Sequence, residues 1–308
     1  MKQAPARPLG TRTPLVITAS HDAVLQAVYR YHLLTSVQLV RACGYSHNSL
    51  ARVQRLTKQL GDNGYLLSFP RPVVRGKAPL VYTLARKGLT YLKDGGFAVR
   101  AYFRPSREQE KSYLFLEHTL SLNDVLIAAA NLHTVAPGYS LASFTHEREL
   151  KRTPYKVRMW HGEEEEPVTV IPDAFLQFVK HQENGKDKEI PILLELDRAT
   201  AEQKHFRRNF RARIAFLKEE GYKKLLGTAT ITFAYAVAVS GEKRRDELRS
   251  WARKELADTR EQRWLSNLFL FADLPRVLDP KQLFIDRVWF TPFDNALQPQ
   301  GLFEAQVL

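Results

Sequence analysis

The chain has 308 residues, of which 44% are hydrophobic, and carries a formal net charge of +13. This length suggests two domains, with enough apolar material to form a core in each. The single cysteine, Cys43, excludes an internal disulfide framework and any cysteine-based metal cluster, and it favours a reducing compartment. The weakly polar run 225–239 is too short to span a membrane. We therefore expect a soluble, cytoplasmic protein.

The excess positive charge lies in the first third of the chain. Residues 1–110 hold 17 Lys and Arg against 5 Asp and Glu, whereas residues 111–308 hold 29 against 28. This asymmetry indicates a polyanionic partner for the first segment, above all nucleic acid. A basic membrane-surface module would need an amphipathic helix with an apolar exposed face, which this segment lacks. Residues 1–20 are basic and proline-rich, which predicts a flexible arm and not a secretory signal.

Residues 21–95 have the pattern of a helix-turn-helix domain. Apolar residues recur at helical spacing in three segments, 22–34, 36–42 and 47–60. Thr35 and Gln38 are spaced as a capping box at the start of the second helix. Gly44 and Tyr45 form the short glycine-containing turn, and Ser46 is the expected cap of the third helix.

The third predicted helix has the residue distribution of a recognition helix. Small hydrogen-bonding groups at its start would reach base edges, and cations further along would contact phosphates. Its candidate DNA contacts are His47, Asn48, Ser49, Arg52, Arg55 and Lys58. A solvated charged face is the plain alternative for such a helix.

A basic hairpin follows the three helices. We expect strands at 65–69 and 80–84, with a helix at 86–93 closing the unit. The loop between the strands adds Arg71, Arg75 and Lys77 to the candidate DNA contacts. Three helices and a basic hairpin predict a DNA-binding winged helix-turn-helix, with a protein-binding winged helix as the alternative.

A linker at 96–110 precedes a second domain at 111–308. Its expected helices are 112–132, 201–220 and 242–256, and its expected strands are 141–150, 168–179, 190–196, 228–239, 269–271 and 284–289. Loops are expected at 154–167, which contains the run Glu163–Glu166, and at 181–189. The order helix, three strands, helix, strand predicts an α+β or α/β domain resembling the PD-(D/E)XK nuclease-like fold, a mixed sheet flanked by helices.

Two acidic residues occupy the positions at which such nucleases bind a divalent metal. Asp173 follows Pro172 beside the second strand, and Glu195 lies near the end of the third. Two carboxylates of this kind suit Mg²⁺ or Mn²⁺, which prefer hard oxygen ligands. Asp197 stands where the nuclease lysine is expected, and Lys204 in the next helix could reach back to the site. Asp197 could instead be a third metal ligand or a helix cap.

Structural explanations compete with this interpretation. Thr200 and Gln203 have capping-box spacing, which gives a purely structural account of the same corner. Other polar positions that could complete the site are Glu117, His118, Asn123, Asp124, His146 and Glu147. The cations of the helix at 201–220 lie off its apolar stripe, either as a phosphate-contacting ridge or as a solvated face: Lys204, Arg207, Arg208, Arg211 and Lys218.

The chain resembles the plasmid replication-relaxation family. The resemblance spans about residues 22–250 and is carried by the helix-turn-helix and by the segments PLVYTLARKGLTYL (79–92), LEHTLSLNDVLIAA (116–129), IPDAF (171–175) and LLELDRAT (193–200). The family motif is an acidic residue after Pro, then Glu-x-Asp-Arg. The matching positions are Asp173, Glu195, Asp197, Arg198 and Thr200. The resemblance implies a role in the replication or DNA relaxation of plasmids or other mobile elements.

Three functions follow from these observations. The first is a sequence-specific DNA-binding protein acting in replication, relaxation or mobilisation, with the winged helix as targeting head. The second is a metal-dependent nuclease or nickase using Asp173 and Glu195. The third is a transcriptional regulator with an inactive nuclease-like domain. The expected partners are double-stranded DNA and other replication or mobilisation proteins, with no membrane; a dimer is compatible with the sequence.

Overall fold

The computed structural model describes residues 15–71, 78–99, 112–161, 164–183, 185–256, 264–275, 278–293 and 298–304. The chain divides into two compact units, residues 1–116 and 117–308. The expected N-terminal arm lies largely outside the described residues, as does most of the expected linker. None of the described helices is long and apolar enough to cross a membrane.

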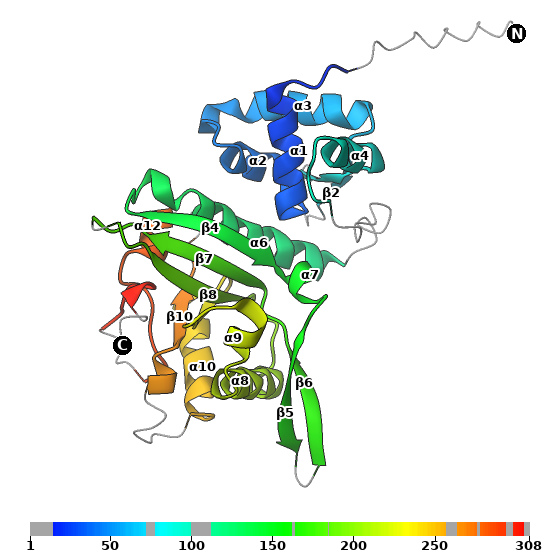
Figure 1. Ribbon diagram of the computed structural model, residues 1–308. Helices are drawn as coiled ribbons and strands as arrows, with labels where there is room; N and C mark the ends of the chain where they lie inside the picture. Colours follow the sequence, from blue (N-terminus) through cyan, green and yellow to red (C-terminus); the bar gives the residue numbers. More distant parts are fainter. Residues whose placement is uncertain are drawn as a thin grey trace, which may run out of the picture. The chain divides into compact units, whose positions relative to one another are not determined.

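The described part of the first unit contains helices and a small sheet (Figure 1). In chain order these are α1 (Ala19–Tyr31), β1 (Leu34–Thr35), α2 (Ser36–Ala42), the 3-10 turn η1 (His47–Ser49), α3 (Leu50–Asp62), β2 (Leu66–Pro70), β3 (Leu80–Leu84) and α4 (Arg86–Asp94). Strand β3 pairs antiparallel with both β1 and β2, so the sheet order is β1–β3–β2.

Local signals in the sequence determine the start and end of α2. The Gln38 N–H donates to Thr35 Oγ1 at 3.3 Å, and the Thr35 N–H donates to Gln38 Oε1 at 3.1 Å, which confirms the capping box. After the helix, Gly44 takes a left-handed φ of 66° that a glycine adopts without strain. Ser46 precedes the first helical turn at His47, as expected, but it makes no side-chain capping bond: its Oγ contacts Ser49 Oγ at 3.1 Å, and the chain enters α3 through η1.

The second unit is built on a five-stranded mixed sheet. Its strands are β4 (Tyr139–His146), β7 (Ala174–Lys180), β8 (Lys188–Asp197), β9 (Thr232–Val237) and β10 (Phe269–Asp273), in the order β10–β9–β8–β7–β4. Strands β8, β9 and β10 run parallel, whereas β4–β7 and β7–β8 pair antiparallel. The carboxyl ends of β8, β9 and β10 therefore meet at one edge of the sheet.

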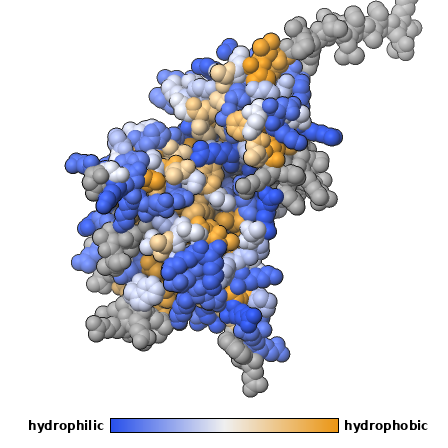
Figure 2. Space-filling view, viewed as in Figure 1, coloured by the Kyte–Doolittle hydropathy of each residue, from blue (hydrophilic) through white to orange (hydrophobic). Residues whose placement is uncertain are grey.

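Helices and a late segment, which comprises residues 278–293 and 298–304, cover the sheet. The remaining described elements are α6 (Tyr113–Ala130), η2 (Leu132–Thr134), α7 (Glu147–Leu150), α8 (Gln203–Lys218), α9 (Gly221–Leu226), α10 (Gly241–Arg253) and α12 (Pro280–Phe284). On one face, Phe210 of α8 packs on Phe269 of β10, with ring centroids 4.5 Å apart. Elsewhere in the unit, Phe178 of β7 contacts Phe284 and Phe303 of the late segment. Hydrophilic residues make up most of the face seen in Figure 2, with apolar groups between them.

The expected loop at 154–167 is wrong. The structure has an antiparallel hairpin there, β5 (Tyr155–His161) and β6 (Glu164–Val170), which projects from the body of the unit (Figure 1). Alternate residues Val157, Val168 and Val170 are buried in the same core as α8. The acidic run concealed this period-2 pattern, because exposed glutamates on a strand resemble a solvated loop.

Two further expectations for the second unit are wrong. No continuous strand forms over the expected range 284–289. Phe284 is the last residue of α12, which Asp279 caps, and in this region Trp289 and Phe290 form isolated bridges. The capping box at Thr200 and Gln203 is also absent, because the residue preceding the first turn of α8 is Glu202.

Candidate nucleic-acid interface and carboxylate cluster

Helix α3 has one buried and one exposed face. Its buried residues are Val53, Leu56, Thr57 and Leu60. The exposed face carries Arg52, Arg55 and Lys58 at the i, i+3, i+6 spacing of a single helix surface. The three cations predicted from the sequence therefore lie on the solvent side of the helix, where they are accessible to a polyanion.

The three cations of this face differ in their side-chain contacts. Arg52 Nη2 donates to Ser20 Oγ at 2.8 Å, and its guanidinium carbon lies 5.1 Å from the centroid of the Tyr45 ring. Lys58 Nζ forms an ion pair with Asp62 at 2.6 Å. Arg55 has no hydrogen bond or ion pair within the part of the chain that the structure describes. Arg52 and Arg55 therefore keep an unneutralised charge.

The remaining candidate DNA contacts lie in the turn before α3 and in the β2–β3 hairpin. His47 and Asn48 of η1 are exposed and Ser49 is half-buried. Arg71 is half-buried, and its N–H donates to the Pro79 carbonyl at 2.8 Å, which extends the β2–β3 hairpin by one pair. Arg75 and Lys77 lie outside the described residues.

The second unit brings Asp173 beside Glu195. Asp173 directly precedes β7, whose Ala174 pairs with Leu194 of β8. The Leu196 N–H donates to Asp173 Oδ2 at 2.7 Å, and His118 Nε2 of α6 lies 3.1 Å from Oδ1. Burial disfavours a charged imidazole, but the hydrogen bond and charge of Asp173, with the charge of Glu147, outweigh it and raise the pKa of His118.

Glu195 is bound by a cation from α8. Arg213 Nε and Nη2 donate to Glu195 Oε1 at 2.7 and 2.6 Å, and Arg213 Nη1 donates to the Asn209 carbonyl at 3.0 Å. Burial raises the pKa of Glu195, and the Asp173 carboxylate adds to that rise, while Arg213 opposes it. The Tyr235 hydroxyl is buried nearby and has no hydrogen-bond partner among the described residues.

Asp197 is bound by an arginine of α10. Arg244 Nε donates to Asp197 Oδ2 at 2.8 Å and Arg244 Nη2 to Oδ1 at 3.1 Å, and Nη2 also donates to the Ala201 carbonyl at 2.7 Å. The Ala199 N–H donates to Asp197 Oδ2 at 2.8 Å, where Ala199 has a left-handed φ of 57°. Arg244 also lies over the Trp251 ring, 4.7 Å from its centroid. Asp197 thus stabilises the turn after β8 and does not cap α8.

The lysine expected to reach back does not contact the cluster. Lys204 is exposed and forms no ion pair with Asp173 or Glu195 in the described parts of the chain. The cation that contacts the cluster is Arg213, about two and a half turns further along α8, which was not predicted from the sequence. Its signal was present: Phe206, Phe210, Arg213 and Leu217 share the helical spacing of the buried stripe, so the stripe contains a cation that needs a buried partner.

The other cations of α8 are largely neutralised within the unit. Arg207 and Arg211 both pair with Glu255, the latter at 3.5 Å, and Arg208 pairs with Glu166 of β6 at 2.9 Å. These pairs favour a structural role over a phosphate-contacting ridge. Glu117 of α6 similarly binds Arg198 at 3.5 Å.

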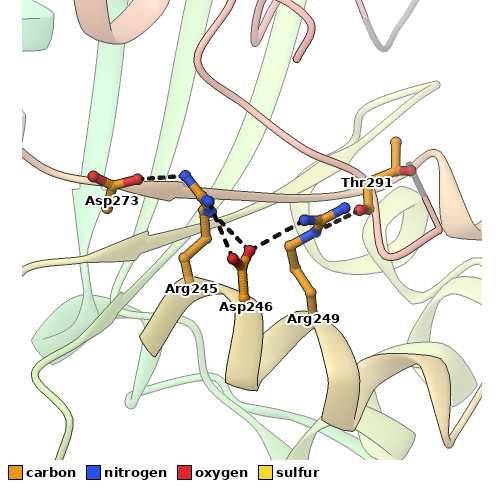
Figure 3. Close-up of polar contacts among 5 residues, drawn as sticks. All are labelled: Arg245, Asp246, Arg249, Asp273 and Thr291. Atoms are coloured by element: carbon orange, nitrogen blue, oxygen red, sulfur yellow. Dashed lines mark hydrogen bonds and ion pairs between the residues drawn. The ribbon is translucent and has the colours of Figure 1, made fainter. Parts of the chain in front are cut away.

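Two arginines of α10 join the late segment to the sheet edge (Figure 3). Arg245 binds Asp273 at 2.7 Å and Asp246 at 3.1 Å. Arg249 donates to the same Asp246 at 3.1 Å and to the Thr291 carbonyl at 2.9 Å. Both guanidiniums lie near the Phe290 ring, at 4.3 and 5.0 Å from its centroid. Asp246 thereby links the carboxyl end of β10 with the segment that follows α12.

Comparison with models of known protein families assigns the chain to a family. A family model described as replication-relaxation matches residues 25–232, more than half of the chain. The chain belongs to the replication-relaxation family. Membership links it to the replication or relaxation of plasmids and other mobile elements, and it confirms the resemblance found in the sequence. No curated protein and no solved structure matches the chain.

Side chains of α6 and α8 contact the two carboxylates of this replication-relaxation protein at which a divalent cation is expected. Among the described residues, no group of three or more His, Cys, Asp or Glu side chains is placed to hold a metal ion. Asp173 and Glu195 supply hard oxygen donors, but His118 and Arg213 are bound to them. Mg²⁺ or Mn²⁺ bound between the two would lie close to the Arg213 guanidinium, whose positive charge would repel the metal ion.

Proposed function

We propose that this replication-relaxation protein binds double-stranded DNA sequence-specifically through its first unit, which has the layout of a winged helix-turn-helix. One observation carries the proposal. Elements α1, β1, α2, α3, β2 and β3 follow one another in the winged-helix order, with the sheet order β1–β3–β2, and α3 presents an exposed cationic face. The first unit would thus direct the chain to its site on DNA.

The roles of the contact residues follow from their chemistry. His47, Asn48 and Ser49 are short hydrogen-bonding groups at the leading end of α3, suited to base edges in the major groove. Arg55 and Lys58 lie further along the helix, where phosphates pass. The β2–β3 hairpin, with Arg71 at its base, would lie along the backbone or in the minor groove.

Duplex binding by the full chain tests this proposal. A duplex would first be selected from a random pool with the wild-type protein, and binding would be followed by fluorescence anisotropy at several salt concentrations. Arg55→Ala should weaken binding and lower the slope of log K against log salt by about 0.9, the value for one phosphate contact. Arg253→Ala removes one exposed arginine from α10 and serves as the control, which should bind like the wild type. If Arg55→Ala leaves the affinity and the salt slope unchanged, as the control does, α3 does not face DNA.

A metal-dependent nuclease or nickase is the second proposal. The observation that favours it is the adjacency of Asp173 and Glu195 at the carboxyl end of β8, in a mixed sheet with the element order of nuclease-like folds. Incubation of supercoiled plasmid with the protein and Mg²⁺ or Mn²⁺ tests it. Nicking that disappears in Asp173→Ala would establish cleavage. Intact plasmid under every metal condition would leave the second unit as a module that holds DNA or a protein partner, as in a regulator.

A further inference from the structure

Arg52 differs from the other cations of α3 because groups outside the helix hold it. Its Nη2 donates to Ser20 Oγ in the first turn of α1, and its guanidinium lies over the ring of Tyr45 in the turn before α3. Both partners are neutral, so the full positive charge of Arg52 remains. A stacked, hydrogen-bonded guanidinium also has fewer accessible rotamers than a solvated one.

The two neighbouring cations of α3 differ from Arg52, one because it has no partner among the described residues and the other because its charge is neutralised. Arg55 is exposed without a partner in the described residues, so it must lose rotamer freedom whenever it contacts DNA. Lys58 is paired with Asp62, so its charge is already compensated. Of the three, only Arg52 combines a free charge with a fixed orientation.

We propose that Ser20 and Tyr45 are positioning residues that hold the Arg52 guanidinium ready to read a guanine edge in the major groove. This inference rests on the proposed DNA-binding function. A guanidinium carries five N–H donors. Ser20 binds one of them, which leaves enough for the two parallel hydrogen bonds that arginine makes to guanine O6 and N7. Fixing the side chain beforehand removes an entropy cost that would otherwise weaken the specific complex.

The proposal predicts a loss of selectivity without a loss of fold. Affinities would be measured for the selected duplex and for a scrambled duplex of the same composition, using the full chain. Ser20→Ala and Tyr45→Leu should each weaken binding to the selected duplex by about 2- to 10-fold, the range for immobilising one side chain, and leave the scrambled duplex nearly unchanged. Ser20→Thr keeps the hydroxyl and should bind like the wild type. Thr90→Ala, an exposed hydroxyl on α4, is the matched control.

Each alternative result has a distinct meaning. Arg52→Lys keeps the charge but loses the planar fork, so it should also lose selectivity. If Ser20→Ala weakens both duplexes equally, Arg52 contacts phosphate and the base-reading role is overturned. If Arg52→Ala loses selectivity while Ser20→Ala and Tyr45→Leu lose none, the positioning role is overturned. If the wild type selects no sequence from the pool, the proposed function itself fails, before any variant is compared.

Discussion

Arg244→Ala should destabilise the second unit more than the removal of any exposed cation. The Arg244 and Asp197 side chains are only 7% and 9% exposed, and two hydrogen bonds of 2.8 and 3.1 Å join them. Truncating the arginine leaves a buried carboxylate without its counter-ion and the Ala201 carbonyl without its donor. Breaking a buried pair on one side costs about 3–5 kcal/mol. For a unit of this size, that lowers the melting temperature by roughly 6–20 °C, at 2–4 °C per kcal/mol.

Tryptophan fluorescence is the appropriate assay, because the chain places all its tryptophans in the second unit: Trp160, Trp251, Trp264 and Trp289. Urea or thermal unfolding followed at these residues reports that unit separately from the first. The double variant Asp197→Asn with Arg244→Met is the matched control. It removes both charges together and should recover most of the lost stability. A single Arg244→Ala variant within about 1 kcal/mol of the wild type would refute the reasoning, since such a loss is typical of an exposed pair.

Further outcomes are expected for four substitutions. Asp62→Asn releases Lys58 from its ion pair and should steepen the salt dependence of DNA binding by about 0.9, while an unchanged slope would place Lys58 away from phosphate. Gly88→Ala should destabilise the first unit by about 1–3 kcal/mol by overpacking, because the new Cβ would lie 2.3 Å from the Tyr65 carbonyl. Gly61→Ala in α3 meets nothing within 4 Å and should instead stabilise by about 0.5–1 kcal/mol; hydrogen exchange of α3 and α4 measures both, and equal signs would contradict the packing argument. Burial raises the pKa of Asp246, but hydrogen bonds from Arg245 and Arg249 outweigh it and lower the pKa below 3.8. Its stabilisation is therefore present above that value and lost as pH falls through the lowered pKa. Wild type and Asp246→Asn should converge in melting temperature only at acid pH; curves that stay parallel at acid pH would show that the contribution of Asp246 does not depend on its charge.

The first unit was predictable because its signals are local. Thr35, Gln38 and Gly44 fix both ends of α2 within ten residues of sequence, and strand β3 was predicted with its observed bounds. What the sequence missed there was the 3-10 entry to α3. Ser46 is the residue before the first turn, as its type predicts, but its side chain contacts Ser49 Oγ and not a backbone N–H.

The second unit was predictable in its order and less so in its contacts. The helix–strand succession around Asp173 and Glu195 was found, as was their adjacency. The partners of the acidic residues were not, because Arg213 and Arg244 lie 18 and 47 positions away along the chain from Glu195 and Asp197. Residue type alone made Lys204 the candidate, whereas helical phase places Arg213 on the buried side of α8. Pairing across such separations depends on the packed fold and not on local spacing.

The parallel half of the sheet determines where this chain can be truncated. The family match ends at residue 232, where β9 begins, so most of β9 and all of β10 and α10 lie beyond it. A polypeptide cut at that limit would leave β8 without its parallel neighbour, with a row of unpaired backbone groups on a strongly apolar strand. Exposed edges of that kind recruit other chains and aggregate. The end of the family match is therefore not a position at which this chain can be truncated. An expression fragment should extend through the segment that follows α12.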